Sequence, residues 1–138
     1  MKINIFYDTI KYRLRGTKKV KELIIKVIMN EKKVPGDLNF VFTNDNFLRK
    51  INREFLNHDY YTDVIAFDTS EGDTVSGEIY ISVDTIRINA KKYRVSLREE
   101  IIRVMIHGTL HLCGYDDKEE EEKRSMFERG EIYVKEIF

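Results

Sequence analysis

Several features are scarce or absent in this chain of 138 residues, and each absence excludes a class of protein. The single cysteine, Cys113, permits no intramolecular disulfide, so the chain is not a disulfide-stapled secreted domain. One proline and seven glycines exclude a collagen-like or a Pro/Gly-rich disordered chain. No apolar run approaches the roughly 20 residues that a membrane-spanning helix needs.

The amino-terminal segment lacks the features of a signal peptide. Its apolar run is short and is interrupted by Asn4, Asp8 and Lys11. We therefore expect a cytoplasmic protein that does not associate with membranes. Hydrophobic residues make up 42% of the chain, which is enough for one packed core, and the length predicts a single domain over residues 1–138.

Net charge is absent as well, because 24 Lys and Arg residues balance 24 Asp and Glu residues. The charge is unevenly distributed, however. Residues 1–33 carry a net +7, whereas residues 116–138 carry a net −4. A neutral protein with one basic part is suited to contact an RNA backbone. Lys18, Lys19 and Lys21 are our candidate RNA-binding residues in that part.

Hydrophobic periodicity predicts about four strands and five helices. Alternating residues or short apolar runs indicate strands at residues 2–7, 37–43, 63–67 and 77–82. Apolar residues at helical spacing indicate helices at about 17–30, 47–55, 84–93, 96–114 and 118–138. The Pro-Gly pair at 35–36 is expected to break the chain before the second strand. The pattern predicts an α+β fold, with helices packed on a small mixed sheet.

The segment 107–117, His-Gly-Thr-Leu-His-Leu-Cys-Gly-Tyr-Asp-Asp, carries the chemistry. His107 and His111 are four residues apart in a predicted helix, so both imidazoles lie on one face and can bind one metal ion. Gly114 is suited to end that helix, and the chain that turns back beyond it can bring a carboxylate to the same ion. Two imidazoles, Asp117 and a water molecule make an ordinary catalytic zinc site. The residues leave open whether Asp116 or Asp117 faces the ion.

Gly108 distinguishes this segment from the H-E-x-x-H metalloproteases, because it stands where they have their general-base glutamate. Glycine costs about 1 kcal/mol relative to alanine inside a helix. Its presence indicates that a neighbouring strand or a substrate comes close to the helix backbone there.

The histidine segment resembles the signature of the YbeY family, the single-strand-specific endoribonucleases and rRNA maturation factors of bacteria. Two other segments resemble this family in the same register, and the likeness covers most of the chain. They are Ile51-Asn52 followed by Asp59, Thr62-Asp63-Val64 and Phe67, and then Gly77-Glu78-Ile79. The resemblance implies an α+β fold, a metzincin-like metal site on a helix with one Zn²⁺ ion, and ribosomal RNA or the small ribosomal subunit as partner. We expect a monomer.

Three positions depart from the family pattern. Asp117 stands where the family has its third metal-binding histidine, Leu56 where it has an arginine, and His58 where it has a lysine. An aspartate still binds zinc, but its negative charge makes the ion a weaker Lewis acid. Loss of the arginine removes a cation that could stabilise a phosphorane-like transition state. Metal binding is expected to survive these three changes more easily than catalysis.

The polar loop before the third strand supplies the remaining candidates. His58 is a candidate for the missing cation or for the third metal ligand, or it is an exposed loop histidine. Asp63 is a candidate catalytic residue, or it caps a turn before a buried strand. Tyr60 and Tyr61 are candidates for stacking on unpaired RNA bases, or they pack over the edge of the sheet.

These features predict a metal-dependent endoribonuclease that cuts single-stranded ribosomal RNA during maturation and ribosome quality control. Two alternatives stay open. Leu56 favours a non-catalytic, metal-binding ribosome-assembly factor, which a closed four-ligand metal shell would support. A metal-dependent hydrolase of peptides or small molecules is the other alternative, and Gly108 weighs against its peptidase form.

Overall fold

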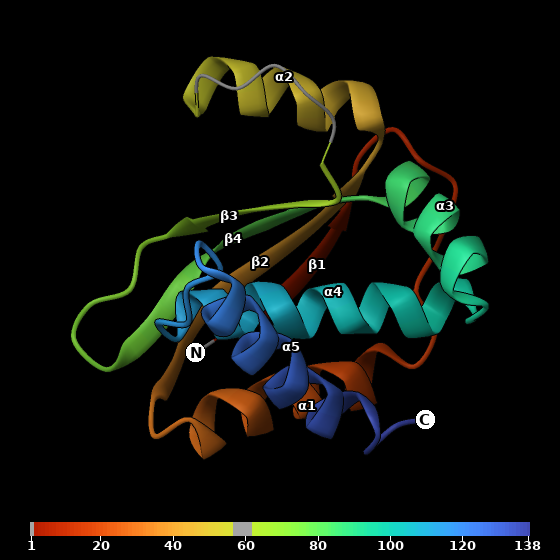
Figure 1. Cartoon of the computed structure of the whole chain (residues 1–138). Helices are drawn as coiled ribbons and strands as arrows, with labels where there is room; N and C mark the ends of the chain where they lie inside the picture. The colour runs from red at the N-terminus through yellow and green to blue at the C-terminus, as the bar shows by residue number, and fades with distance from the viewer. Residues whose placement is uncertain (1, 57–61) are drawn as a thin grey trace.

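The computed structural model describes residues 2–56 and 62–138, and it confirms the predicted α+β class (Figure 1). Four strands and five helices occur in this described part of the chain. In chain order they are β1 (Ile3–Tyr7), α1 (Thr17–Asn30), β2 (Val34–Thr43), α2 (Asp45–Phe55), β3 (Val64–Asp68), β4 (Thr74–Ser82), α3 (Val83–Tyr93), α4 (Leu97–Leu112) and α5 (Glu120–Val134). No helix among these residues is long and apolar enough to cross a membrane.

The four strands form one mixed sheet in the order β1-β2-β4-β3. β1 pairs with β2 and β2 pairs with β4 in parallel, so helices must carry the chain between them. β3 and β4 follow each other in the chain and pair antiparallel as a hairpin. This topology places β3 at one edge of the sheet.

Helices cover both faces of the sheet. α1, α4 and α5 lie on one face, and α2 lies on the other (Figure 1). The main core lies between the sheet and the first set, where fully buried side chains interlock, including Ile24, Ile28, Phe40, Phe42, Ile79, Ile81, Ile101 and Ile102. A smaller cluster of Leu48, Ile51 and Ile65 attaches α2 to the opposite face of β3. β3 is therefore held between two helical layers.

The start of β2 corrects one expectation, because Pro35 and Gly36 do not precede the strand but belong to it. The register of β2 against β4 shifts between Pro35 and Leu38, which accommodates the proline. A Cβ atom built on Gly36 would lie 2.2 Å from Ser76 Oγ on β4. The glycine therefore allows the two strands to approach each other, rather than ending the strand.

Local signals fix both ends of α4, and the predicted role of Gly114 is confirmed. Ser96 caps the helix, since its side chain accepts a hydrogen bond of 3.0 Å from the backbone N–H of Glu99. Gly114 has a φ of 111°, which suits glycine at the end of the helix. A Cβ atom on Gly108 would lie 3.0 Å from the side chain of Ile79 on β4. The glycine therefore lets α4 lie close to the sheet at the histidine pair.

A partly buried carboxylate, Glu31 at the end of α1, binds the segment after α4 and the helix α5. Glu31 accepts hydrogen bonds from the hydroxyls of Tyr115 at 2.6 Å and Tyr133 at 2.5 Å, and from Nε of Arg129 at 2.8 Å. Burial raises the pKa of Glu31, but these hydrogen bonds outweigh it and hold the pKa below its ordinary value. The charged form of Glu31 therefore stabilises the fold.

Glu31→Ala is expected to lower the free energy of unfolding by about 2–3 kcal/mol near neutral pH, since it removes hydrogen bonds to a charged acceptor. Glu136→Ala is the control, because it removes only an exposed ion pair with Lys26 at 2.9 Å; its cost should be below about 1 kcal/mol. A lowered pKa means that the Glu31 contribution is present above the pKa of the unfolded chain and is lost as pH falls through the folded value. Urea unfolding at about pH 7 and about pH 3 measures this. An equally large effect of Glu31→Ala at both pH values would contradict it.

Candidate functional site

The two histidines lie near the carboxyl end of α4 and face a cavity of about 810 Å³. The walls of this cavity, which we call the histidine cavity, come from α2, β3, α4 and α5 and from the segments before β3 and after α4. Residues of α2 and of α4 lie on opposite faces of the sheet, so the cavity extends around the edge formed by β3. The site therefore forms because β3 lies at the edge of the sheet and helices cover both faces of the sheet.

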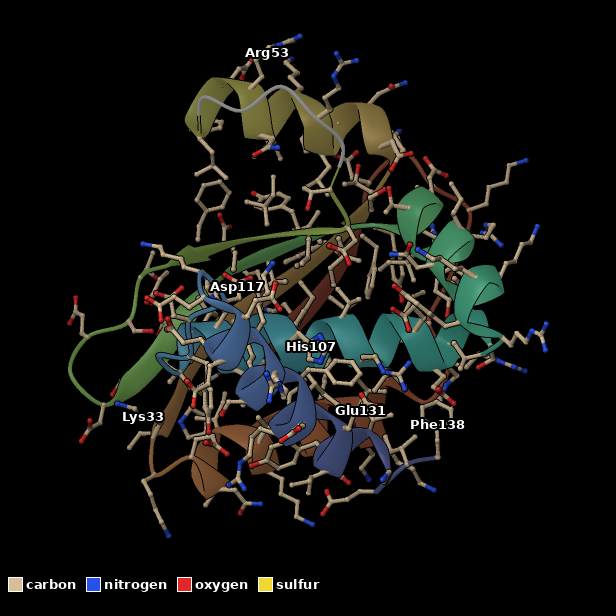
Figure 2. The ribbon with its side chains drawn as sticks, viewed as in Figure 1. Lys33, Arg53, His107, Asp117, Glu131 and Phe138 are labelled. Atoms are coloured by element: carbon tan, nitrogen blue, oxygen red, sulfur yellow. The ribbon has the colours of Figure 1, made fainter. Side chains whose placement is uncertain are left out.

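The structure brings together four of the predicted site residues. His107, His111, Asp63 and Asp117 all line the histidine cavity. Figure 2 shows His107 on α4 where α5 passes in front of it, and Asp117 on the segment that follows α4. The two histidines and the two carboxylates thus face one space, although Asp63 and Asp117 are far apart in the sequence.

The other predicted residues do not line this cavity or lie outside the described residues. His58, Tyr60 and Tyr61 fall in the undescribed segment 57–61. Lys18, Lys19 and Lys21 are on α1, which contributes no residue to the described walls. The described lysines that do line the cavity are Lys118 and Lys123.

His107 is the more enclosed histidine. Its Nε2 atom is buried and has no hydrogen-bond partner among the described residues. Burial lowers the pKa of His107, and the opposing charge of Glu131 does not offset this. The imidazole is therefore neutral near neutral pH, which is the form that binds metal. A Cβ atom on Gly130 of α5 would lie 2.7 Å from this Nε2, so the glycine leaves the space that the ring occupies.

The carboxylate that faces the histidine cavity is Asp117. Asp117 is exposed, and its backbone N–H donates a 2.8 Å hydrogen bond to Oδ1 of Asp116. Asp116 is engaged in this turn and does not belong to the described walls. Of the two carboxylates that the sequence left open, the geometry favours Asp117.

The two histidines meet the requirements of a metal site more closely than the candidate third ligand, Asp117, does. A buried, unpartnered imidazole nitrogen on His107, one helical turn from His111, is the arrangement that a metal site requires. Among residues 2–56 and 62–138, however, no three His, Cys, Asp or Glu side chains gather closely enough to hold an ion. The described part of the chain thus places His107, His111 and Asp117 in the walls of one cavity, without gathering them into a ligand set.

Asp63 stands at the start of β3, where its backbone carbonyl accepts a 2.9 Å hydrogen bond from the N–H of Ser82. This bond fixes the residue at the end of the β3–β4 ladder. Burial raises the pKa of the Asp63 carboxyl, although the backbone N–H groups of Asp63 and Val64 oppose the shift. A carboxylate with a raised pKa in a cavity is suited to accept a proton.

Several residues that line the histidine cavity were not proposed as site residues from the sequence, among them Asn52, Lys118, Lys123 and Phe127. Asn52 is only 2% exposed, although it is polar. No signal in the sequence marked it, because asparagine is common on ordinary helices and only the structure shows this burial. The sequence did not suggest Lys118 and Lys123 as site residues, because they occur in the acidic carboxyl-terminal segment.

Comparison with known proteins identifies the family of this α+β domain. The family model described as Endoribonuclease YbeY matches residues 3–137, so the chain belongs to the YbeY family of endoribonucleases, which are hydrolases. The resemblance seen in the sequence is thereby confirmed.

Individual relatives support this placement. The chain is 42% identical over 135 residues to Endoribonuclease YbeY of Flavobacterium johnsoniae, covering 91% of this chain and 96% of that protein. It is 48% identical over 103 residues to Endoribonuclease YbeY of Flavobacterium psychrophilum, covering 75% of this chain and 74% of that protein. The solution structure of TM1509 from Thermotoga maritima is similar with a TM-score of 0.69 and 30% identity, covering 99% of this chain and 89% of that one.

Proposed function

We propose that this chain is a metal-dependent endoribonuclease that cuts single-stranded ribosomal RNA during its maturation and quality control. One observation carries the proposal: in a chain of the YbeY family, a histidine pair and two carboxylates from distant segments line one cavity. The whole chain, residues 1–138, acts as one domain and as a monomer.

His107, His111 and Asp117 would hold the metal, with aspartate in place of the family's third histidine. Zinc is the preferred ion because imidazole nitrogens suit it. When bound, zinc polarises a phosphoryl oxygen and lowers the pKa of a water molecule. The exposed position of Asp117 allows its carboxylate to remain solvated while it contributes to the site.

Other residues of the histidine cavity would handle the substrate. Lys118 and Lys123 place two cations in its walls, where they attract the phosphodiester. Asp63 accepts a proton, which suits a carboxyl group whose pKa burial has raised. His58, which lies outside the described residues, stays a candidate for the missing cation or for the third ligand. Tyr60 and Tyr61 stay candidates for stacking on bases.

Leu56 favours a second candidate function, a non-catalytic ribosome-assembly factor with a metal ion. This residue lines the histidine cavity. By the resemblance to the family it takes the place of an arginine, so an apolar side chain would replace the expected cation. In this case the lysines and α1 would hold RNA without cutting it. The two functions share the metal and the RNA and differ only in cleavage.

Removal of the metal tests the proposal. Purified protein should contain about one zinc ion per chain by elemental analysis. It should cut a single-stranded ribosomal RNA fragment, and it should leave the same fragment uncut when a complementary strand is annealed to it. Chelation should abolish cleavage, because the water and phosphoryl group lose their activating cation, and added zinc should restore it.

The outcomes separate the candidates. Cleavage that survives complete chelation would contradict a metal-dependent nuclease. Bound zinc and bound RNA without cleavage of any single-stranded ribosomal fragment would support the assembly factor.

A further inference from the structure

A second cavity, of about 570 Å³, is also lined by His107. It shares Asp63, His107 and Phe127 with the histidine cavity, so the two spaces meet at these residues. Its remaining walls come from α3, α4 and α5 and from the segment between α3 and α4. An RNA strand bound at the histidine pair could therefore extend into this second cavity.

Two exposed aromatic rings stand in the walls of the second cavity. Tyr93 at the carboxyl end of α3 is 57% exposed, and Phe127 on α5 is 50% exposed. The ring of Phe127 lies 5.8 Å from that of His107, measured between centroids. Aromatic rings left open to solvent in a groove are the usual platform on which unpaired bases stack.

The charges of the second cavity differ from those of the histidine cavity. Asp63, Glu100 and Glu131 contribute carboxylates, and Arg103 is the cation among its described walls. The guanidinium of Arg103 is already engaged, because it donates to Glu131 at 2.7 Å and to Glu100 at 2.8 Å. These walls offer hydrogen-bond acceptors and repel a phosphate. A neutral ligand with amino groups fits them, whereas a phosphate fits the lysines of the histidine cavity.

We propose that the second cavity is a nucleobase subsite, which holds the base beside the phosphodiester that is cut. The base stacks on Tyr93 and Phe127, and an exocyclic amino group donates to the carboxylates of the wall. The subsite therefore prefers cytosine, adenine or guanine to uracil. This inference rests on the proposed ribonuclease function and adds the part of the substrate that is recognised.

Binding of short oligonucleotides tests the subsite separately from cleavage. Fluorescence anisotropy in excess EDTA compares oligocytidine, oligouridine and an abasic strand of the same length on the full chain. Oligocytidine should bind most tightly and the abasic strand least. Tyr93→Ala should weaken binding of oligocytidine about fivefold or more, because one stacking surface is removed. Tyr93→Phe should retain the affinity, since the ring remains.

Ile88→Ala is the matched control, because Ile88 is 65% exposed on the same helix and lines neither cavity. It should leave binding unchanged. Circular dichroism verifies that each variant is folded. Equal affinity of the wild type for oligocytidine and the abasic strand, or of Tyr93→Ala and the wild type for oligocytidine, would overturn the subsite. Equal affinity for cytidine and uridine strands would overturn the role of the amino group.

The binding experiment tests the base-binding subsite, and the cleavage experiment tests the nuclease function, so the two results can differ. Base-dependent binding that Tyr93→Ala removes, in a protein that cuts no RNA with zinc present, supports the subsite and contradicts the nuclease. Zinc-dependent cleavage with no effect of Tyr93→Ala on binding supports the nuclease and contradicts the subsite.

Discussion

Replacement of His111 by alanine is expected to lower kcat/KM for single-stranded RNA by at least about a thousandfold, because the substitution removes one of two nitrogens that hold the activating cation. His111 is exposed near the end of α4, so the substitution should leave the fold intact. RNA affinity should change by less than about threefold, since the phosphate contacts come mainly from basic side chains. Steady-state cleavage, elemental analysis and filter binding measure these three quantities.

Charge reversal on α1 provides the reciprocal control. The helix α1 does not line the histidine cavity. The metal content should therefore not be altered by Lys18→Glu, Lys19→Glu or Lys21→Glu. They should weaken RNA binding and reduce its dependence on salt, by roughly 0.7 in the log–log slope for each phosphate that the protein no longer neutralises. Wild-type binding that is insensitive to salt and to these reversals would remove the case for RNA on α1. Full cleavage by His111→Ala would refute the metal-dependent mechanism.

Local signals predicted the parts of the fold that depend on local contacts. Ser96 caps α4 through a bond to a residue three positions away, and Gly114 ends the helix through its own backbone conformation. Such features depend only on residues that are close in the sequence, so the sequence predicts them. The predicted start of β2 was wrong, because the conformation of Pro35 and Gly36 depends on their pairing with β4, which follows about 40 residues later in the chain.

The same distinction applies to the site. Helical spacing alone predicted that His107 and His111 share a face. Asn52, Tyr93 and Phe127 could not be predicted, because they come from α2, α3 and α5 and meet the histidines only through tertiary packing. Their types are also common on ordinary helices. An asparagine that is only 2% exposed becomes a signal only once the structure shows its burial.

The proposed replacement of the family's arginine by Leu56 alters the balance of charge in the histidine cavity. Leu56 makes one wall apolar, while Lys118 and Lys123 approach the same space from the segment that follows α4 and from α5. These lysines are flexible point charges, and they lack the planar fork with which arginine binds phosphate. They can attract the substrate, but they hold a transition state less firmly. A slow enzyme is therefore expected, and its rate depends all the more on the metal.

The third metal ligand determines the strength of that metal site. Asp117→Ala is expected to weaken zinc binding by at least about tenfold, because only two protein nitrogens remain. Asp117→His should retain or tighten it, since an imidazole suits zinc and adds no negative charge. Asp116→Ala is the matched control: its side chain accepts a bond from the Asp117 backbone and does not line the described cavity, so the zinc affinity should change by less than about threefold.

Competitive titration of the metal-free protein against a chromophoric chelator measures these affinities without any need for cleavage. Wild type, Asp117→Ala, Asp117→His and Asp116→Ala should give two groups, with only Asp117→Ala weakened. If Asp117→Ala binds zinc as tightly as the wild type, the third ligand is another residue. His58, the remaining histidine of the chain, then becomes the leading candidate, because an imidazole suits zinc. His58→Ala should then show the tenfold loss that Asp117→Ala did not. A loss in Asp116→Ala with none in Asp117→Ala would instead exchange the roles of the two neighbouring carboxylates.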